Sequence, residues 1–561
     1  MEKDFDVIFV NAPNHATFPH FPIGIGYLNE ILKSDNIKTN IIDIQNMIIN
    51  KKLEFGQSIL KDIETILKDN HANIFIFSIM NSTYIWAIYI IKIVKKYNPD
   101  SKIIIGGSHA TLLKDQLLIE HKEIDIVCIY EGEQIISDLV KSLLCKDYDL
   151  LSNIKNIYYR DKNNTIKFNG ENTLLENLDI LPIIDYDMNE YSNKASISLD
   201  VGRGCPHNCK FCVTKTIWKR TPRYKSSKKI VEESIVYFNK LKENKSKIVL
   251  YEHDNFIFNK DILKEIISIK NTLNKKYYYG CSGELNDIDD EVIELLHKSG
   301  CKYIFIGIES GSKHIQKEMK KNLNLNDVEE KISKLNKKNI TVEVNFIIGF
   351  KEEKIIDLIN SYRLMYIIKF LNPVLNKVNF TMLSPEPTSI VAESLSEDEF
   401  ILDTKSIYCE NFKNVPIDIN KFNKRFINHL FIVKNPNYDI EKIRDFSKMY
   451  IEILNNFTIT LFILINKYNF KLEEFLDANL EIAHYDETSI ISVLEKYVLN
   501  KNIDLLTLDI FRYEKLRYQY KNKIEINSNE LKFNYDIKNI YIKSIKNPYI
   551  LFKDFPDVSL I

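Results

Sequence analysis

The stretch Gly202-Arg203-Gly204-Cys205-Pro206-His207-Asn208-Cys209-Lys210-Phe211-Cys212 carries three of the eight cysteines of this 561-residue chain. Its thiols, Cys205, Cys209 and Cys212, follow a short apolar run with the spacing C-x3-C-x2-C. Three thiolates on one tight loop can hold three irons of a cubane 4Fe–4S cluster and leave one iron open for a small chelating ligand. A structural zinc needs a fourth ligand, and the nearby candidate, His207, lies inside the loop itself. The spacing therefore favours a cluster over zinc.

Strand and helix patterns alternate downstream of the cysteines. Buried runs predict strands, with helical patterns between them, at 197–201, 247–251, 277–282, 303–308, 341–348 and 376–382. Six such units are too few for a full eight-stranded barrel. The sequence therefore predicts an α/β domain over residues 196–395 that is a partial (β/α)6 barrel.

Three further stretches accompany the cysteines in a fixed order: Glu252-His253-Asp254-Asn255-Phe256, Cys301–Gly311 and Val344–Phe350. Together with the aromatic Phe211 before the last cysteine, they resemble the radical S-adenosylmethionine (SAM) enzymes, whose core is a TIM-like partial barrel. The resemblance implies that a 4Fe–4S cluster on Cys205, Cys209 and Cys212 reduces S-adenosylmethionine. The resulting 5′-deoxyadenosyl radical would take a hydrogen atom from an unactivated carbon, a step for which acid–base groups are inadequate. The SAM contacts implied by the resemblance are Phe211, Asp254, Glu284, Gly307, Glu309, Ser310 and Ile348.

One position departs from the family pattern. Relatives often have an arginine after the third strand, where this chain has Gly280-Cys281-Ser282-Gly283-Glu284-Leu285. Glu284 stands at the place expected for that arginine. A ligand contact and a surface carboxylate are both open alternatives for it.

The N-terminal region alternates between apolar runs and helical patterns, which predicts a doubly wound, Rossmann-like parallel sheet over residues 1–150. Ligands of such sheets bind beyond the carboxyl ends of the strands. The loops at these ends resemble, in their order, the cobalamin-binding domain that precedes the radical domain in one large subclass. The implied cobalamin contacts are Pro13, Gly24, Ser78, Thr83, Gly106, Gly107, His109, Glu131 and Gly132.

The lower axial ligand of cobalt has no candidate motif in this region. The Asp-x-His-x-x-Gly motif of methionine-synthase-like domains is absent from the sequence, so the resemblance implies base-off cobalamin without a protein histidine. His15 and His20 lie in the first loop and are expected to be solvated, whereas His109 is expected to contact either the corrin or a domain interface.

Residues outside these two domains show weaker patterns. Residues 151–195 are rich in turns and are predicted as a connector, with a hairpin tip at 161–164. Residues 396–561 are predicted as a mainly helical C-terminal domain that shapes the substrate cavity, with a strand-like tail from Lys532.

Charge and composition exclude several classes of protein. Lys and Arg number 76 against 77 Asp and Glu, so the basic excess typical of nucleic-acid binders is missing. No apolar run is long enough to cross a membrane, and the first six residues are too acidic for a signal peptide. We therefore expect a cytoplasmic enzyme without a membrane or nucleic-acid partner.

The leading hypothesis is a cobalamin-dependent radical SAM C-methyltransferase that acts on a peptide or small molecule and takes electrons from a flavodoxin- or ferredoxin-type donor. A cyclisation or rearrangement with the same cofactors, without methyl transfer, is the alternative, and a cobalamin-binding sensor with an inactive cluster is a third. Methylthiotransferases carry further N-terminal cysteines, whereas the first 127 residues here contain none. The sequence identifies no catalytic acid, base or hydrogen donor.

Overall fold

The computed structural model describes residues 4–14, 21–185, 196–241, 247–410, 412–468, 470–471, 474–475, 487–500 and 503–522, and the single residues 536, 538 and 541. His15, His20 and most of the predicted tail after Lys532 lie outside the described residues. The chain forms two compact units. The first comprises residues 1–282 and 384–432, and the second comprises residues 283–383 and 433–561.

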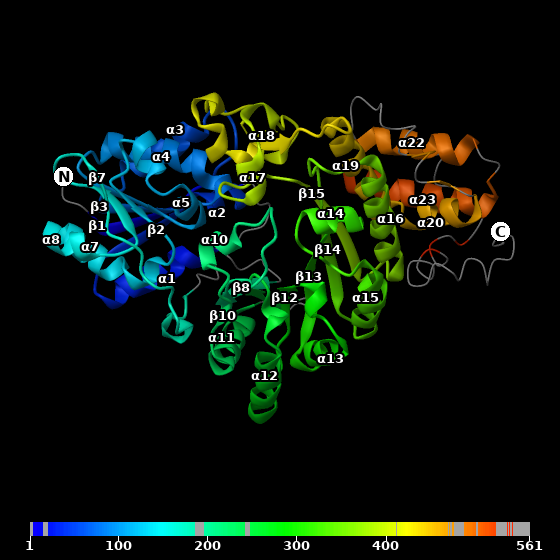
Figure 1. Ribbon diagram of the computed structural model, residues 1–561, viewed down its shortest axis with the longest axis horizontal. Coiled ribbons are helices and arrows are strands. Elements are labelled where there is room, and N and C mark those ends of the chain that lie inside the picture. Colours follow the sequence, from blue (N-terminus) through cyan, green and yellow to red (C-terminus); the bar gives the residue numbers. More distant parts are fainter. Residues whose placement is uncertain are drawn as a thin grey trace. The chain divides into compact units, whose positions relative to one another are not determined.

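A sheet with five neighbouring parallel strands forms the core of the first unit. In spatial order its parallel strands are β2 (Thr39–Asp43), β1 (Phe5–Asn11), β3 (Ala72–Ser78), β4 (Lys102–Gly106) and β5 (Ile126–Cys128). Their central residues are buried on both faces, so helices have to cover both sides. Figure 1 shows α3 (Ile59–Lys68) and α4 (Tyr84–Tyr97) on one face, and α1 (Ile23–Ser34) and α7 (Ile136–Cys145) on the other. The predicted doubly wound sheet is confirmed.

Two antiparallel strands extend this sheet beyond the prediction. β6 (Ile157–Arg160) pairs with β5, and β7 (Ile166–Phe168) pairs with β6 across the predicted hairpin tip at 161–164. The sequence predicted the hairpin tip within a connector but not the two strands, because both strands are short and β7 is a mostly exposed edge strand.

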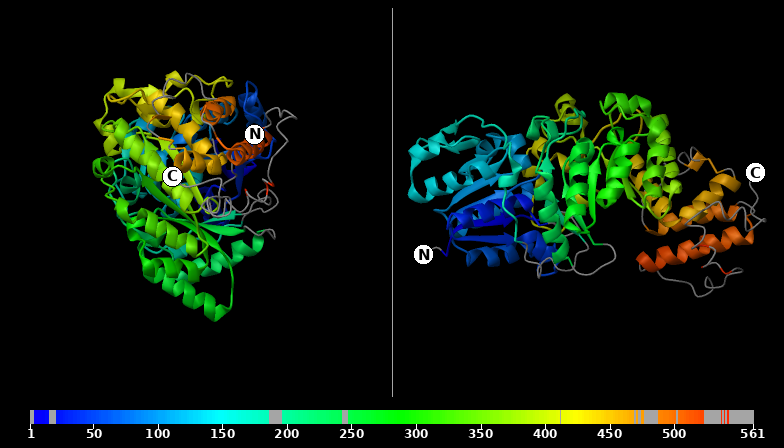
Figure 2. Two further views of the ribbon diagram at one scale, coloured as in Figure 1. Left: turned by 90° about the vertical axis from the view of Figure 1, so that its right-hand side faces the viewer. Right: turned by 90° about the horizontal axis from the view of Figure 1, so that it is seen from below.

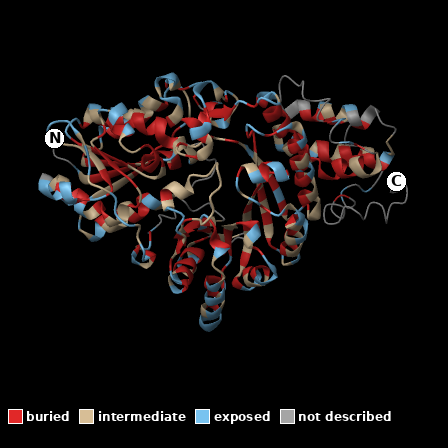
Figure 3. Ribbon diagram, viewed as in Figure 1, coloured by how far each residue is buried: buried red, intermediate tan, exposed pale blue. Residues whose placement is uncertain are grey.

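The six strands expected after the cysteine motif are all present, three in each unit. β8 (Ser196–Asp200), β11 (Ile248–Glu252) and β12 (Tyr279–Gly283) form a parallel ladder in the first unit. β13 (Cys301–Glu309), β14 (Thr341–Ile348) and β15 (Asn376–Met382) form another in the second. Figure 3 shows the strands largely buried, whereas the outer helices carry the exposed residues.

Helices follow these strands along the chain. Their bounds are α11 (Ser227–Lys240), α12 (Lys260–Leu273), α13 (Asp290–Ser299), α14 (Lys313–Glu318), α15 (Val328–Lys337) and α16 (Ile355–Leu371). The predicted strand–helix alternation of a partial barrel is therefore confirmed.

The residues predicted as one C-terminal domain contribute to both units. Residues 384–432 belong to the first unit, where Phe412 stacks on Trp86 of α4 with ring centroids 5.5 Å apart. The second unit contains α19 (Ile440–Asn456), α20 (Thr458–Lys467), α22 (Glu487–Asn500) and α23 (Leu505–Asn522), drawn in orange tones in Figure 2. Among the described residues, no single helix is long and apolar enough to span a membrane; α19 and α20 qualify only as a pair bent by 97°.

Candidate active site

The three cysteines share a loop between β9 (Gly202–Arg203) and α10 (Thr214–Trp218), and each is half-buried and outside any disulfide. The Thr214 amide donates a hydrogen bond to the Sγ of Cys212 at 3.4 Å. A backbone donor at this place suits a thiolate. In the described part of the chain, no three His, Cys, Asp or Glu side chains converge tightly enough to hold one metal ion.

Two glycines fix the start of this loop. β9 pairs antiparallel with β10 (Arg223–Tyr224), so that residues 221–224 lie directly against Gly202 and Gly204. A Cβ atom on either glycine would overlap the backbone of this neighbouring segment, and Gly204 has a φ of +98°. Only glycine fits both the space and the left-handed backbone before the first cysteine.

Asp254, a predicted SAM contact, holds the loop at both ends. Its Oδ2 accepts a hydrogen bond from the Gly204 amide at 2.7 Å, and its Oδ1 accepts one from the Thr214 hydroxyl at 3.4 Å. Gly204 precedes the first cysteine and Thr214 follows the last. The carboxylate therefore positions the cysteine loop, and its contact with SAM stays a prediction.

A network of buried charges joins the cysteine loop to the loop after β5. Arg203, next to Gly204, donates to Glu131 at 2.8 Å, to Glu133 at 2.6 Å and to Asp200 at 3.0 Å. Arg223, its register partner on β10, donates to the same Glu131 at 2.9 Å. Glu131 and the adjacent Gly132 are predicted cobalamin contacts. In the structure, the Glu131 carboxylate faces the radical domain.

The second unit brings two other predicted residues together around a lysine. Lys321 lies 2.7 Å from a carboxylate oxygen of Glu284 and 3.3 Å from one of Glu309, and at most 10% of each side chain is exposed. Burial raises the pKa of Glu309, and Lys321 opposes this rise. Glu284 is thus no surface residue, and the positive charge expected at this end of the barrel comes from Lys321.

Gly307 leaves room for this cluster. A Cβ at Gly307 would overlap the carboxylate of Glu309 and lie 3.3 Å from the Lys321 ammonium. Glu309 itself has a φ of +67°, where the pairing of β13 with β14 shifts register. The Gly-x-Glu spacing therefore has a steric reason, because the Glu309 side chain folds back over the glycine.

Two of the remaining SAM predictions, Ser310 and Ile348, lie in the second unit, and the third, Phe211, lies in the first. Ser310 is fully buried, and its hydroxyl lies 3.2 Å from that of Ser361 on α16. Ile348 is fully buried at the end of β14, and its carbonyl accepts a hydrogen bond from the Leu383 amide. Phe211 is half-buried in the cysteine loop. Their contacts with SAM stay predictions.

The predicted cobalamin loops lie at the carboxyl edge of the first sheet. Its strand order changes direction between β1 and β3, and ligands of doubly wound sheets bind at such a switch point. Pro13 follows β1 and Gly24 lies at the start of α1, whereas Ser78 ends β3 and Thr83 lies five residues farther along the chain. Gly24 lies in the first turn of α1 and is exposed, and a Cβ there would meet no atom within 4 Å.

Gly106 and Gly107 bring the β4 loop close to the β3 loop. Gly107 has a φ of +97°, and a Cβ there would lie 2.6 Å from the Ile79 carbonyl oxygen. The Ile79 amide donates to the Gly106 carbonyl at 2.8 Å, and the His109 amide donates to the Ile79 carbonyl at 3.1 Å. The glycine pair thus allows the loops after β3 and β4 to pack closely, independently of any ligand.

His109 is enclosed at an interface. Its side chain is 1% exposed on α5 (Ser108–Leu113), and its Nε2 lies 2.9 Å from the carbonyl oxygen of Phe426. Burial lowers the pKa of His109 to about 4, so the ring is neutral near pH 7. The structure places it between α5 and residues 384–432, and its corrin contact stays a prediction.

Sequence patterns missed the partners of several of these residues. Lys321 lies in a Lys- and Asn-rich loop, and Arg203 and Arg223 look like ordinary surface cations in the sequence. Arg203 did carry a signal, since it lies between two glycines directly before the first cysteine. Nothing local indicated Lys321.

The donor groups fit the implied cofactors. Three thiols on one loop match the ligand set of a cluster with an open iron, with an amide aimed at one sulfur. At the switch point, the loops after β1 and β3 lie at the edge where ligands of doubly wound sheets bind.

Two family models match the chain in the predicted order. Residues 14–140 match the B12-binding domain, and residues 199–365 match the radical SAM superfamily. The second match begins in β8 and ends in α16, so it includes the cysteine loop and the Glu284–Lys321–Glu309 cluster.

Known relatives point to more than one reaction. The chain is 26% identical over 376 residues to an uncharacterized methyltransferase of Pyrococcus horikoshii, covering 65% of this chain and 76% of the relative. It is also 26% identical over 323 residues to the anaerobic magnesium-protoporphyrin IX monomethyl ester cyclase of Rubrivivax gelatinosus, and spans only 56% of that enzyme.

A solved structure shares the fold. The cobalamin-dependent S-adenosylmethionine radical enzyme OxsB, solved with aqua-cobalamin and S-adenosylmethionine bound, superposes with a TM-score of 0.61. The match has 17% identity and covers 97% of this chain and 84% of OxsB.

Proposed function

The chain belongs to the radical SAM superfamily and carries a B12-binding domain ahead of its radical domain, and from this premise we propose that it is a cobalamin-dependent methyltransferase. Its substrate is an unactivated carbon of a peptide or small molecule, and its electrons come from a flavodoxin- or ferredoxin-type protein. When bound, the cluster supplies the electron that cleaves S-adenosylmethionine to a 5′-deoxyadenosyl radical, and methylcobalamin supplies the methyl group.

One observation carries this proposal. The loop that holds the cysteines and the loop after β5 of the B12-binding domain belong to one compact unit and are joined by the ion pairs of Arg203 with Glu131 and Glu133. A radical enzyme that also transfers a methyl group needs both cofactors to reach one substrate. Direct pairing of the two loops supports such an arrangement.

The residues of the chain have distinct roles in this proposal. Cys205, Cys209 and Cys212 ligate three irons, and Asp254 keeps their loop closed by accepting hydrogen bonds from both ends. In the second unit, two carboxylates and one ammonium give the buried Glu284–Lys321–Glu309 cluster a formal charge of −1. A site of this sign favours the positively charged sulfonium of S-adenosylmethionine.

The cobalamin site is assigned to the carboxyl edge of the first sheet. Pro13, Gly24, Ser78 and Thr83 lie on the loops that flank the switch point, and Gly106, Gly107, His109, Glu131 and Gly132 follow on the next two loops.

A cyclisation or rearrangement with the same cofactors is the second candidate. It is favoured by the similarity to the magnesium-protoporphyrin ester cyclase, which covers 56% of this chain. The two candidates differ in whether cobalamin is remethylated.

The test is the transfer of label to cobalamin in the full chain, which needs no knowledge of the substrate. The chain is reconstituted anaerobically with iron, sulfide and cobalamin, reduced, and mixed with S-adenosylmethionine deuterated in its methyl group. We expect deuterated methylcobalamin and S-adenosylhomocysteine by mass spectrometry. Formation of 5′-deoxyadenosine with unlabelled cobalamin would instead support the second candidate.

Cysteine variants separate the two reactions. In Cys212→Ser we expect 5′-deoxyadenosine formation to be lost while methyl loading of cobalamin persists. Reduced cobalamin takes the methyl group of S-adenosylmethionine by a two-electron displacement, which needs no electron from the cluster. Cys145→Ser, at an exposed cysteine outside the loop, serves as the control and should retain both activities.

A further inference from the structure

The ion pairs between the two loops place fixed charge next to the cysteines. Arg203 is two residues from Cys205 and reaches three carboxylates, those of Glu131, Glu133 and Asp200, with its Nε, Nη1 and Nη2 atoms. At most 11% of any of these side chains is exposed. Water screens such charges poorly, so their effect extends to the neighbouring loop.

Three donors converge on the carboxylate of Glu131. Its carboxylate accepts hydrogen bonds from Arg203, from Arg223 and from the amide of Leu175, which belongs to the segment between the two domains. Trp218 lies under both guanidinium groups, whose central carbons are 5.7 and 5.6 Å from its ring. Two like charges in register on paired strands thus share one carboxylate and one aromatic face.

The formal charges do not cancel. Three carboxylates face two guanidinium groups, which leaves one negative charge beside the cysteine loop. Negative charge near a cluster disfavours its reduced form, whose own charge is more negative. The carboxylates of the B12-binding domain would therefore lower the reduction potential of a cluster held by the cysteines of the radical domain.

We propose that Glu131 and Glu133 are positioning residues that act through Arg203: they hold the first strand of the cysteine loop and set the reduction potential of its cluster. The proposal rests on the proposed function only in requiring a cluster on Cys205, Cys209 and Cys212. The ion pairs of Glu131 and Glu133 with Arg203 let the B12-binding domain set the reduction potential of the cluster, whether or not cobalamin is bound.

Glu133 is the best position for the test, because its carboxylate pairs with Arg203, whereas that of Glu131 also binds Arg223 and Leu175. The full-length chain is reconstituted with iron and sulfide, without cobalamin or substrate, and the midpoint potential is determined by an EPR-monitored redox titration. Glu133→Gln removes one negative charge and keeps the shape of the side chain. We expect its potential to shift to a higher value than that of the unaltered chain.

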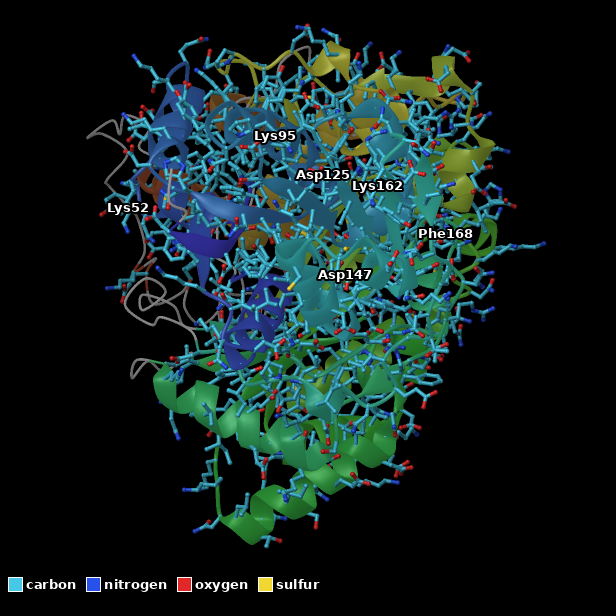
Figure 4. The ribbon with its side chains drawn as sticks, turned by 90° about the vertical axis from the view of Figure 1, so that its left-hand side faces the viewer. Lys52, Lys95, Asp125, Asp147, Lys162 and Phe168 are labelled. Atoms are coloured by element: carbon cyan, nitrogen blue, oxygen red, sulfur yellow. The ribbon has the colours of Figure 1, made fainter. Side chains whose placement is uncertain are left out.

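Two matched variants separate this effect from a loss of folding. Glu133→Asp keeps the charge and should return the potential toward that of the unaltered chain. Asp125→Asn removes a carboxylate at the other end of β5, where Asp125 pairs with Lys95 and Lys102, and should leave the potential unchanged. Asp125 and Lys95 are labelled in Figure 4.

The remaining outcomes contradict the proposal. An unchanged potential in Glu133→Gln, or equal shifts in Glu133→Gln and Asp125→Asn, would remove the specific role of the network. Loss of iron from both Glu133→Gln and Glu133→Asp would show that Glu133 only folds the loop. An unaltered chain that takes up no cluster would overturn this proposal and the proposed function together, whereas a reducible cluster without methyl loading would overturn the methyltransferase alone.

Discussion

Lys321 shows how a single residue compensates for a departure from a family pattern. Glu284 occupies the place where an arginine was expected, and two buried carboxylates would repel each other without a cation between them. Lys321 supplies this cation at 2.7 and 3.3 Å, from a loop after α14 rather than from the third strand. The departure at Glu284 was evident in the sequence, but its partner was not, because charge pairing between distant loops has no local pattern.

We predict that Lys321→Met weakens the second unit strongly. The substitution leaves Glu284 and Glu309 buried without their cation, and removing one partner of a buried pair costs about 3–5 kcal/mol. Hydrogen exchange of peptides covering β13 measures the loss in opening free energy.

A surface lysine provides the matched control for this variant. Lys334 pairs with Asp290 and Glu330, whose side chains are 76% and 69% exposed. Lys334→Met should cost less than about 1 kcal/mol. Equal effects of the two substitutions would contradict a buried cluster at Lys321.

At the scale of elements, the loop after β14 depends on a buried carboxyl group. Glu353 is fully buried, and its Oε2 accepts hydrogen bonds from the Tyr438 hydroxyl at 2.6 Å and the Gly349 amide at 2.9 Å. The amides of Asn435 and Asn437 donate to its backbone carbonyl. Glu353 thus ties the end of β14 to the segment that leads into α19.

We predict a pH-dependent stability for this connection. Burial raises the pKa of Glu353 to about 7, above the value of about 4.3 in an unfolded chain. The folded unit therefore holds a proton that the unfolded chain has released, so stability falls as the pH rises from about 4.3 to about 7 and then levels off. Glu353→Gln removes this dependence and should gain about 4 kcal/mol relative to the unaltered chain as the pH rises through this interval.

Hydrogen exchange of β14 and α19 peptides at several pH values measures this gain. Glu352→Gln, at the exposed neighbouring position, should show the same pH profile as the unaltered chain. A profile for Glu353→Gln that is also unchanged would refute the role of the buried carboxyl group.

The elements themselves were largely predictable. The predicted strands at 341–348 and 376–382 coincide with β14 and β15, and buried and half-buried residues alternate along β14, which is the period-two pattern of a strand. The return of residues 384–432 to the first unit was not predictable. It depends on contacts such as that of Phe426 with His109, which join segments far apart in the chain.

At the scale of the whole molecule, the order of the two domains was evident from loops and cysteine spacing, and both family matches agree with it. The division into units was not evident from the sequence. The strands β8, β11 and β12 share the first unit with the B12-binding domain, whereas β13, β14 and β15 lie in the second unit. Single-sequence patterns report the burial of a strand but not which neighbours bury it.

We predict that this chain binds cobalamin at the carboxyl edge of its first sheet without a histidine ligand to cobalt. The decisive measurement is EPR spectroscopy of the full-length chain loaded with cob(II)alamin. We expect the spectrum of bound, base-off cobalamin, without the splitting that a coordinated nitrogen produces. A spectrum split by a histidine nitrogen, or one identical to that of free cobalamin, would contradict it.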